Sequence, residues 1–162
     1  MTRPSSHLFP PYPQADRQKH HAGLSSAIQR VLESGSYLMG EEGRAFEDEF
    51  AAHLGAKQVI GLANGTDAIE VMLRAHEIGC GHKVVVPAHA PSAVAAGVLR
   101  CGAEVVFADI EAETFTLCPE SLDAVLRSPQ GLGVKAVLAV HLYGHPADWR
   151  NLRHVANAHG VL

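Results

Sequence analysis

Two runs of consecutive apolar residues constrain the fold more than any other feature of this sequence. Residues 84–86 read Val-Val-Val and residues 136–140 read Ala-Val-Leu-Ala-Val, with no polar residue to mark a side that faces water. A strand with one solvated face alternates apolar and polar side chains, whereas a strand covered by helices on both faces is apolar throughout. The two runs therefore predict buried strands in a parallel sheet with helices on both sides.

Helical periodicity follows each expected strand. Alternation of strand and helix predicts the α/β class, with three layers, a mostly parallel sheet and helices on both faces. Ligands of such sheets gather at the carboxyl ends of the strands. The expected strands are residues 58–63, 83–87, 104–109 and 134–141, and the helices that follow them are residues 67–77, 92–100, 119–126 and 147–158.

The start of the chain differs from this alternating pattern. Residues 1–17 are expected to form a proline-rich arm, and residues 18–162 the domain that follows it. Within that domain, apolar residues at helical spacing predict two amphipathic helices at residues 18–33 and 42–54. Gly55 is placed to end the second helix as its C-terminal cap.

The loop between those two helices carries apolar side chains between glycines. Its central residues are Tyr37, Leu38 and Met39. Such residues would either cover a pocket or contact a second subunit.

The turn from the first expected strand into its helix is a candidate anion site. Asn64 and Thr66 are placed to cap the helix, whose N-terminus presents unpaired N–H groups and the positive end of the dipole. Gly65 lets an anion approach the main chain, and the Thr66 hydroxyl can donate one more hydrogen bond. A phosphate or a carboxylate would fit here, although Asn-Gly-Thr also serves as an ordinary turn and cap.

Composition argues against several classes of protein. The formal charge of −4, without a cluster of lysine or arginine, argues against nucleic acid as a partner. The three cysteines are widely spaced and the histidines include no HExxH pair, so no metal is expected and reduced thiols in a cytoplasmic protein are favoured. No apolar run reaches membrane-spanning length, and the N-terminus lacks the apolar core of a signal peptide.

Four segments carry motifs in a characteristic order. They are Gly-Arg-Ala-Phe-Glu-Asp-Glu-Phe-Ala at residues 43–51 with Leu54 and Gly55, Ala-Asn-Gly-Thr-Asp-Ala-Ile at residues 63–69, Gly-Ala-Glu-Val-Val-Phe-Ala-Asp at residues 102–109, and Val-His-Leu-Tyr-Gly-His-Pro-Ala-Asp at residues 140–148. Together they resemble the DegT/StrS family of pyridoxal-phosphate-dependent nucleotide-sugar aminotransferases, a branch of the fold type I enzymes. The resemblance covers nearly everything from about residue 24 onward, and the last segment is the most specific.

This resemblance implies the large domain of a pyridoxal 5'-phosphate enzyme. Such an enzyme moves an amino group, typically from glutamate, to a keto sugar on a nucleotide diphosphate, for polysaccharide or glycoside synthesis. Gly65, Thr66 and Asp67 match the turn that holds the cofactor phosphate, with Asn64 as the cap. The carboxylate of Asp67 would have to point away from the phosphate.

The resemblance also implies a homodimer. Tyr37, Leu38 and Met39 match a segment that lies near the active site at the dimer interface. Residues 141–144 match a turn beside the cofactor, with a structural rather than a catalytic role.

The sequence departs from the family pattern after the second expected strand. Pro91 stands where the family has an aromatic residue that stacks on the pyridine ring, and Val94 stands where a hydroxyl is usual. His89 offers a ring two positions away. Because proline covers a ring face without π stacking, weaker cofactor binding is expected.

The residues that the resemblance makes catalytic lie beyond the end of this chain. They are an Asp that pairs with the pyridine nitrogen and a Lys that binds the cofactor covalently. Lys19, Lys57, Lys83 and Lys135 match neither, while residues 161–162 resemble the start of a fifth strand. We therefore expect an N-terminal portion of the domain, cut short and without transaminase activity of its own.

The resemblance places the strand at residues 58–63 apart from the others. Its neighbours would be later strands, while the strands at residues 83–87, 104–109 and 134–141 pair among themselves. We therefore expect residues 58–63 to lack partners in this chain.

Two other functions stay open. One is the family's dehydratase branch, in which a His replaces the Lys. The other is a degenerate, non-catalytic remnant that binds a full-length partner or nothing. Pro91 favours the remnant, whereas the intact turn at residues 64–66 favours a working enzyme.

Overall fold

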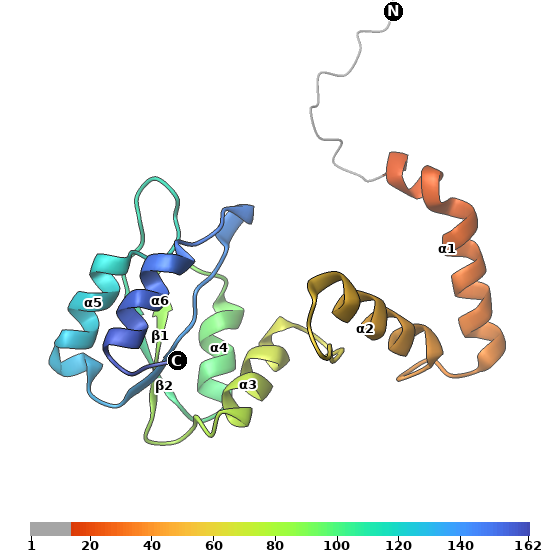
Figure 1. Ribbon diagram of the computed structural model, residues 1–162. Helices are drawn as coiled ribbons and strands as arrows, with labels where there is room; N and C mark the ends of the chain where they lie inside the picture. Colours follow the sequence, from red (N-terminus) through yellow and green to blue (C-terminus); the bar gives the residue numbers. More distant parts are fainter. Residues whose placement is uncertain (1–13) are drawn as a thin grey trace, which may run out of the picture. The chain divides into compact units, whose positions relative to one another are not determined.

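The computed structural model describes residues 14–162 (Figure 1). Residues 1–13, which make up most of the predicted arm, lie outside this part of the chain. The chain divides into two compact units, Met1–Gly61 and Leu62–Leu162, and each is described by itself. None of the helices within the described part is both long and apolar enough to cross a membrane.

The first unit holds the two helices expected from the sequence. α1 spans Gln14–Ser34 and α2 spans Glu41–Leu54. Residues 14–17 therefore belong to α1 and not to the arm. They are mostly polar and show no apolar periodicity, so the sequence pattern did not assign them to the helix. Gly55 ends α2 with a left-handed φ of 65°, which confirms the predicted C-terminal cap.

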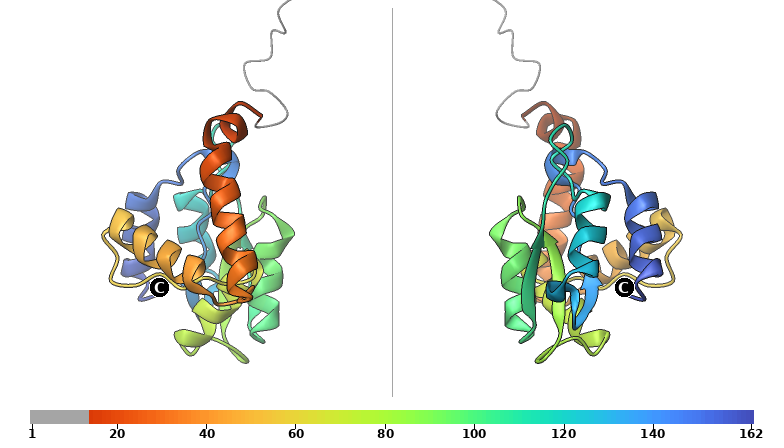
Figure 2. Two further views of the ribbon diagram at one scale, coloured as in Figure 1. Left: turned by 90° about the vertical axis from the view of Figure 1, so that its right-hand side faces the viewer. Right: turned by 90° about the vertical axis from the view of Figure 1, so that its left-hand side faces the viewer.

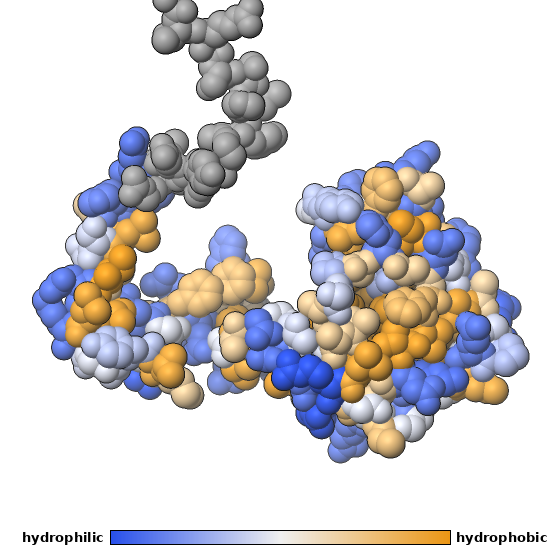
Figure 3. Space-filling model, turned by 180° about the vertical axis from the view of Figure 1, so that it is seen from behind, coloured by the Kyte–Doolittle hydropathy of each residue, from blue (hydrophilic) through white to orange (hydrophobic). Residues whose placement is uncertain are grey.

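Apolar side chains of α1 and α2 are not covered within the first unit. The rings of Phe46 and Phe50 stack with centroids 5.4 Å apart, yet they stay 58% and 40% exposed. An apolar stripe along α1 is visible in Figure 3. A contiguous apolar surface of this kind is typical of a face that contacts other protein. The exposed large apolar residues of the two helices are Leu24, Ile28, Leu32, Phe46, Phe50 and Leu54.

The strand predicted at residues 58–63 is wrong for this structure. The segment is irregular, and no main-chain hydrogen bond joins it to another part of residues 14–162. Its amide at Gly61 donates instead to the side chain of Glu47, with N and Oε1 2.6 Å apart. An apolar, β-branched run shows a preference for strand, but a strand forms only when a neighbour supplies the ladder.

The second unit contains a parallel sheet of three strands. β1 spans Lys83–Pro87, β2 spans Glu104–Ala108 and β3 spans Val134–Val137, in the order β2-β1-β3. The predicted pairing of these strands among themselves is confirmed. The central strand is the Val-Val-Val run, whose side chains are at most 1% exposed.

The third strand is shorter than predicted, and the end of the chain lies beside it. β3 ends at Val137 and not at residue 141. The N–H of Leu162 donates to the C=O of Lys135 at 2.9 Å, and the C=O of Leu162 accepts from the N–H of Val137 at 2.8 Å. These two bonds are those of a parallel ladder, in the direction expected for a further strand.

Helices cover both faces of the sheet, which confirms the three-layer α/β fold (Figure 2). The four helices are α3 at Gly65–Ala75, α4 at Ser92–Arg100, α5 at Pro119–Arg127 and α6 at Trp149–Ala158. Val84 and Val86 of β1 enter a core with α3 and α4, while Val85 enters a second core with α5 and α6. Two short 3-10 helices lie in the connections, η1 at Pro129–Gly131 and η2 at Leu142–Gly144.

Candidate functional site

The turn before α3 forms the helix cap expected from the sequence. Asn64 is extended, with φ −164° and ψ 172°, and its Oδ1 accepts from the N–H of Asp67 at 2.9 Å. Its C=O accepts from the N–H of Ala68 at 3.1 Å, which closes the first turn of α3. The cap thus satisfies the amides of residues 67 and 68. The amides of Gly65 and Thr66 have no acceptor within residues 14–162.

Gly65 and Thr66 supply donors that no other residue of the described chain uses. Neither their main-chain N–H groups nor the Thr66 hydroxyl makes a hydrogen bond within residues 14–162. A Cβ atom built on Gly65 would meet no atom within 4 Å, so the main chain is open on that side. Two N–H groups and a hydroxyl at the positive end of a helix dipole match what a phosphate requires.

Asp67 puts a negative charge beside these donors, but both of its carboxylate oxygens are engaged. Oδ1 accepts from Nη1 of Arg100 at 2.7 Å, and Oδ2 accepts from Nδ2 of Asn64 at 3.0 Å. Arg100 lies at the end of α4 and was not identified from the sequence. No local motif joins two residues that are 33 positions apart.

Pro91 stands at the N-terminus of α4, in the connection that follows β1. It is exposed and precedes the helix with φ −55°. Val94 is buried in the core between α4 and the sheet. This end of β1 therefore offers a ligand neither an aromatic ring at residue 91 nor a hydroxyl at residue 94.

Three aromatic side chains gather from loops that follow three different strands. His89 follows β1, Phe115 follows β2 and Tyr143 follows β3. Their ring centroids are 5.9, 6.1 and 6.2 Å apart, and Nε2 of His89 lies 3.0 Å from the hydroxyl of Tyr143. Phe115 and Tyr143 are 45% and 77% exposed, so this aromatic cluster can contact a ligand. Of the three, only His89 was considered as a ring from the sequence.

The turn after β3 is held by its own residues. Nδ1 of His141 accepts from the N–H of Ala147 at 2.9 Å. Tyr143 and Gly144 have φ values of 54° and 79°, which tighten the turn. His141 thus holds the backbone of the turn in place.

The residues proposed for the subunit contact lie in the first unit. Tyr37, Leu38 and Met39 are 67%, 88% and 93% exposed. Tyr37 and Met39 line a cavity of about 270 Å³ together with Arg30 and Glu42, whose side chains form an ion pair at 2.6 Å. The loop therefore borders a pocket and also presents apolar surface.

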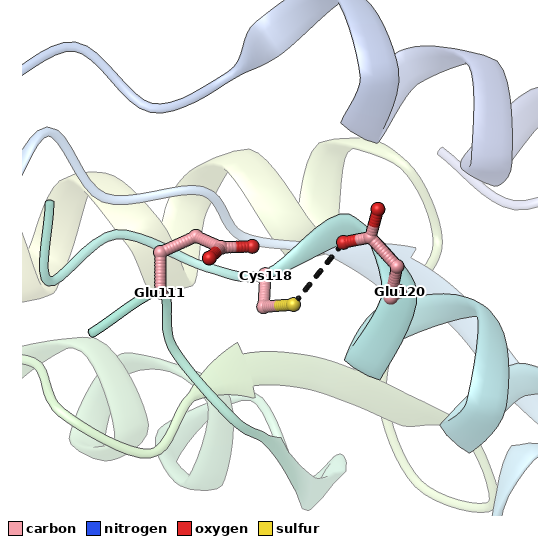
Figure 4. A group of neighbouring side chains, drawn as sticks. All are labelled: Glu111, Cys118 and Glu120. Carbon is pink, nitrogen blue, oxygen red and sulfur yellow. Dashed lines mark hydrogen bonds between the residues drawn. The ribbon is translucent and has the colours of Figure 1, made fainter. Parts of the chain in front are cut away.

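Glu111, Cys118 and Glu120 form a second polar cluster, after β2 (Figure 4). One potential metal-ligand atom from each residue lies within 4.8 Å of the others, although the sequence spacing gave no sign of a metal site. Sγ of Cys118 donates to Oε2 of Glu120 at 3.3 Å. Burial of the thiol, together with the two carboxylates beside it, raises the pKa of Cys118 to about 11. The cluster therefore holds a proton on sulfur at neutral pH.

Cys118 should consequently react slowly with thiol reagents. A pKa of about 11 in place of 9.0 lowers the thiolate fraction at pH 8 roughly a hundredfold, and the rate should rise as the pH approaches 11. We expect iodoacetamide to label the exposed Cys80 well before Cys118, as peptide mass spectrometry over time would measure. Glu111→Gln with Glu120→Gln should speed labelling of Cys118 and leave Cys80 unchanged. Equal rates at the two thiols would contradict the raised pKa.

Comparison with known proteins places this geometry in context. Residues 19–162 match the DegT/DnrJ/EryC1/StrS aminotransferase family. The UDP-N-acetyl-3-dehydro-alpha-D-glucosamine 3-aminotransferase of Acidithiobacillus ferrooxidans is 37% identical over 153 residues, which cover 92% of this chain and 40% of that protein. The chain thus spans about two fifths of the length of the relatives it matches.

Solved structures of two kinds of enzyme resemble the fold. A DegT DnrJ EryC1 StrS aminotransferase from Brucella abortus superposes with a TM-score of 0.85 at 34% identity, over 91% of this chain and 40% of that one. The E. coli GDP-4-keto-6-deoxy-D-mannose-3-dehydratase with bound hydrated PLP gives a TM-score of 0.75 at 27% identity, over 85% of this chain and 36% of that one.

Proposed function

Because the chain belongs to the DegT/DnrJ/EryC1/StrS aminotransferase family, we propose that it carries the phosphate-binding part of a pyridoxal 5'-phosphate enzyme. The whole enzyme would transfer an amino group to a keto sugar linked to a nucleotide diphosphate. The observation that carries this proposal is the set of unused donors on Gly65 and Thr66 at the start of α3.

The residues present fit the phosphate of the cofactor. The two N–H groups and the Thr66 hydroxyl would bind phosphate oxygens, and the absence of a side chain at Gly65 allows the close approach that these bonds need. When bound, the cofactor supplies the electron-withdrawing ring that stabilises negative charge on the substrate. What this chain contributes is the position of that ring, set by where its phosphate is held.

Pro91 bears on how the pyridine ring of the cofactor would be held. An exposed proline at the start of α4 can cover a ring face by van der Waals contact alone. We therefore expect binding energy to come mainly from the phosphate, which makes the α3 donors more important here than in an enzyme with a stacking aromatic at this position.

Two alternatives belong to the same proposal. The dehydratase branch is supported by the likeness to the E. coli dehydratase, at lower identity than the aminotransferases. A non-catalytic binding role is supported by Pro91. Neither is better supported than amino-group transfer.

The cofactor site can be tested on the 162-residue chain with a pair of matched ligands. Pyridoxamine 5'-phosphate carries the phosphate but no aldehyde, so it forms no adducts with surface lysines, and pyridoxamine lacks only the phosphate. We expect the ¹⁵N-labelled chain to show shifts of the Gly65 and Thr66 amides with the phosphate ester, and much smaller shifts with pyridoxamine. Identical responses to the two ligands, or none, would contradict a phosphate site at α3.

We also propose that the complete enzyme is a homodimer with Tyr37, Leu38 and Met39 at the contact. The exposure of these side chains and of the apolar stripe on α1 supports it. Sedimentation of the complete enzyme, wild type against Leu38→Asp, measures it, and a monomeric wild type would refute it.

A further inference from the structure

An anion at the start of α3 faces an electrostatic problem. Asp67 lies one residue beyond the donors on Gly65 and Thr66, in the first turn of the same helix. A carboxylate that close repels a phosphate dianion, and the repulsion is strongest if its oxygens turn toward the bound anion. A phosphate site here therefore needs a cationic group that orients this carboxylate away from the anion and neutralises its charge.

Arg100 both orients and neutralises the Asp67 carboxylate. Its Nη1 binds Oδ1 of Asp67 at 2.7 Å and its Nε binds Oε2 of Glu70 at 2.9 Å, while Asn64 holds the other oxygen of Asp67 at 3.0 Å. With both oxygens held, the Asp67 carboxylate has one orientation. Arg74 binds Glu70 at 2.9 Å, so two carboxylates and two guanidinium groups form a network without net charge.

The packing of α4 on α3 brings Arg100 within reach. Gly97 lies about one turn before Arg100 and is buried. A Cβ atom on Gly97 would stand 2.7 Å from Cγ2 of Ile69 and 3.1 Å from the C=O of Thr66. A side chain there would push α4 away from the first turns of α3, so glycine permits the approach that sets the guanidinium on Asp67.

We propose that Arg100 is a positioning residue of the phosphate site, which acts through Asp67. It holds the Asp67 carboxylate against α4 and neutralises it, so that the donors of Gly65 and Thr66 meet an incoming phosphate without an opposing charge. This inference rests on the phosphate site proposed above. It adds a residue from another helix to that site.

The test is a titration of the ¹⁵N-labelled chain with inorganic phosphate, followed at the Gly65 and Thr66 amides. We expect Arg100→Ala to weaken binding roughly three- to tenfold, the size of an unscreened unit charge several ångströms from a dianion in water. Arg127→Ala is the matched control, because it removes a guanidinium that pairs with Asp123 on α5 and contacts neither Asp67 nor Arg100. It should change binding less than twofold, a bound set by the weak interaction between exposed groups that are not in contact.

A charge rescue separates positioning from packing. Arg100→Ala combined with Asp67→Asn removes the opposing charge, and we expect it to restore binding to near the wild-type level. A loss that Asp67→Asn does not reverse would mean that Arg100 only packs α4 on α3, and would overturn the proposal. If the amides of β1 show that Arg100→Ala disturbs the fold, Arg100→Gln keeps the side-chain stem and serves in its place.

The outcomes also separate this inference from the function on which it rests. Phosphate binding by the wild type that is unchanged in Arg100→Ala and Arg100→Gln overturns the role of Arg100 and leaves the phosphate site intact. Absence of any response at Gly65 and Thr66 in the wild type overturns both.

Discussion

Gly65→Val should weaken binding of pyridoxamine 5'-phosphate and of inorganic phosphate by roughly tenfold or more, because hydrogen bonds to a charged group contribute about 1.5–3 kcal/mol each. The valine side chain would occupy the space through which the phosphate reaches the amides of Gly65 and Thr66. The fold should not change, since a Cβ atom at this position meets nothing within 4 Å and its φ is not in the left-handed region.

Gly43→Val is the matched control for this substitution. Gly43 also lies in the first turns of a helix, its Cβ would meet nothing within 4 Å, and its φ is not left-handed. Isothermal titration gives the affinity of each variant, and thermal unfolding shows whether the second unit has kept its stability. Equal phosphate affinity in the wild type and in Gly65→Val would leave the turn as a plain helix cap.

The core of the second unit could be predicted because its signal is a single run of residues. Val84, Val85 and Val86 point alternately to the two faces of the sheet and are buried on both. No solvated strand could carry such a run, so the three-layer arrangement follows from the sequence. The helix ends at Gly55 and Asn64 were also predictable from a local signal, because a cap depends on residues within one turn of the helix.

The wrong strand at residues 58–63 shows where this reasoning stops. Val59 and Ile60 have the β-branched side chains of a strand, and Ile60 is 72% exposed in this structure. Propensity describes one segment, whereas a strand requires a second segment at the right distance. The sequence could place the three strands that pair with one another, but it could not supply a partner for the fourth.

The candidate site likewise has a local part that could be predicted from the sequence and long-range contacts that could not. The turn before α3 could be predicted because its cap and its donors come from three adjacent residues, Asn64, Gly65 and Thr66. The bond between Asp67 and Arg100 joins residues 33 positions apart, and the bond between His89 and Tyr143 joins residues 54 apart. Contacts of this range depend on how α4 crosses α3 and on which strands are neighbours, and no single-sequence pattern contains that information.

Amide hydrogen exchange should separate residues 58–63 from the sheet by roughly a hundredfold or more, the ratio expected when one segment opens at almost no cost and the other only by disrupting the core. In the sheet, the N–H of Leu138 donates to the C=O of Val85 at 2.9 Å beside a fully buried strand. In residues 58–63, the amide of Gly61 is held only by the side chain of Glu47. Exchange mass spectrometry of the 162-residue chain measures both segments at once, and Glu47→Ala should speed exchange at Gly61 alone. Equal protection of residues 58–63 and 136–140 in a monomer would contradict this prediction. It would mean that residues 58–63 join the β2-β1-β3 sheet in solution as an additional strand.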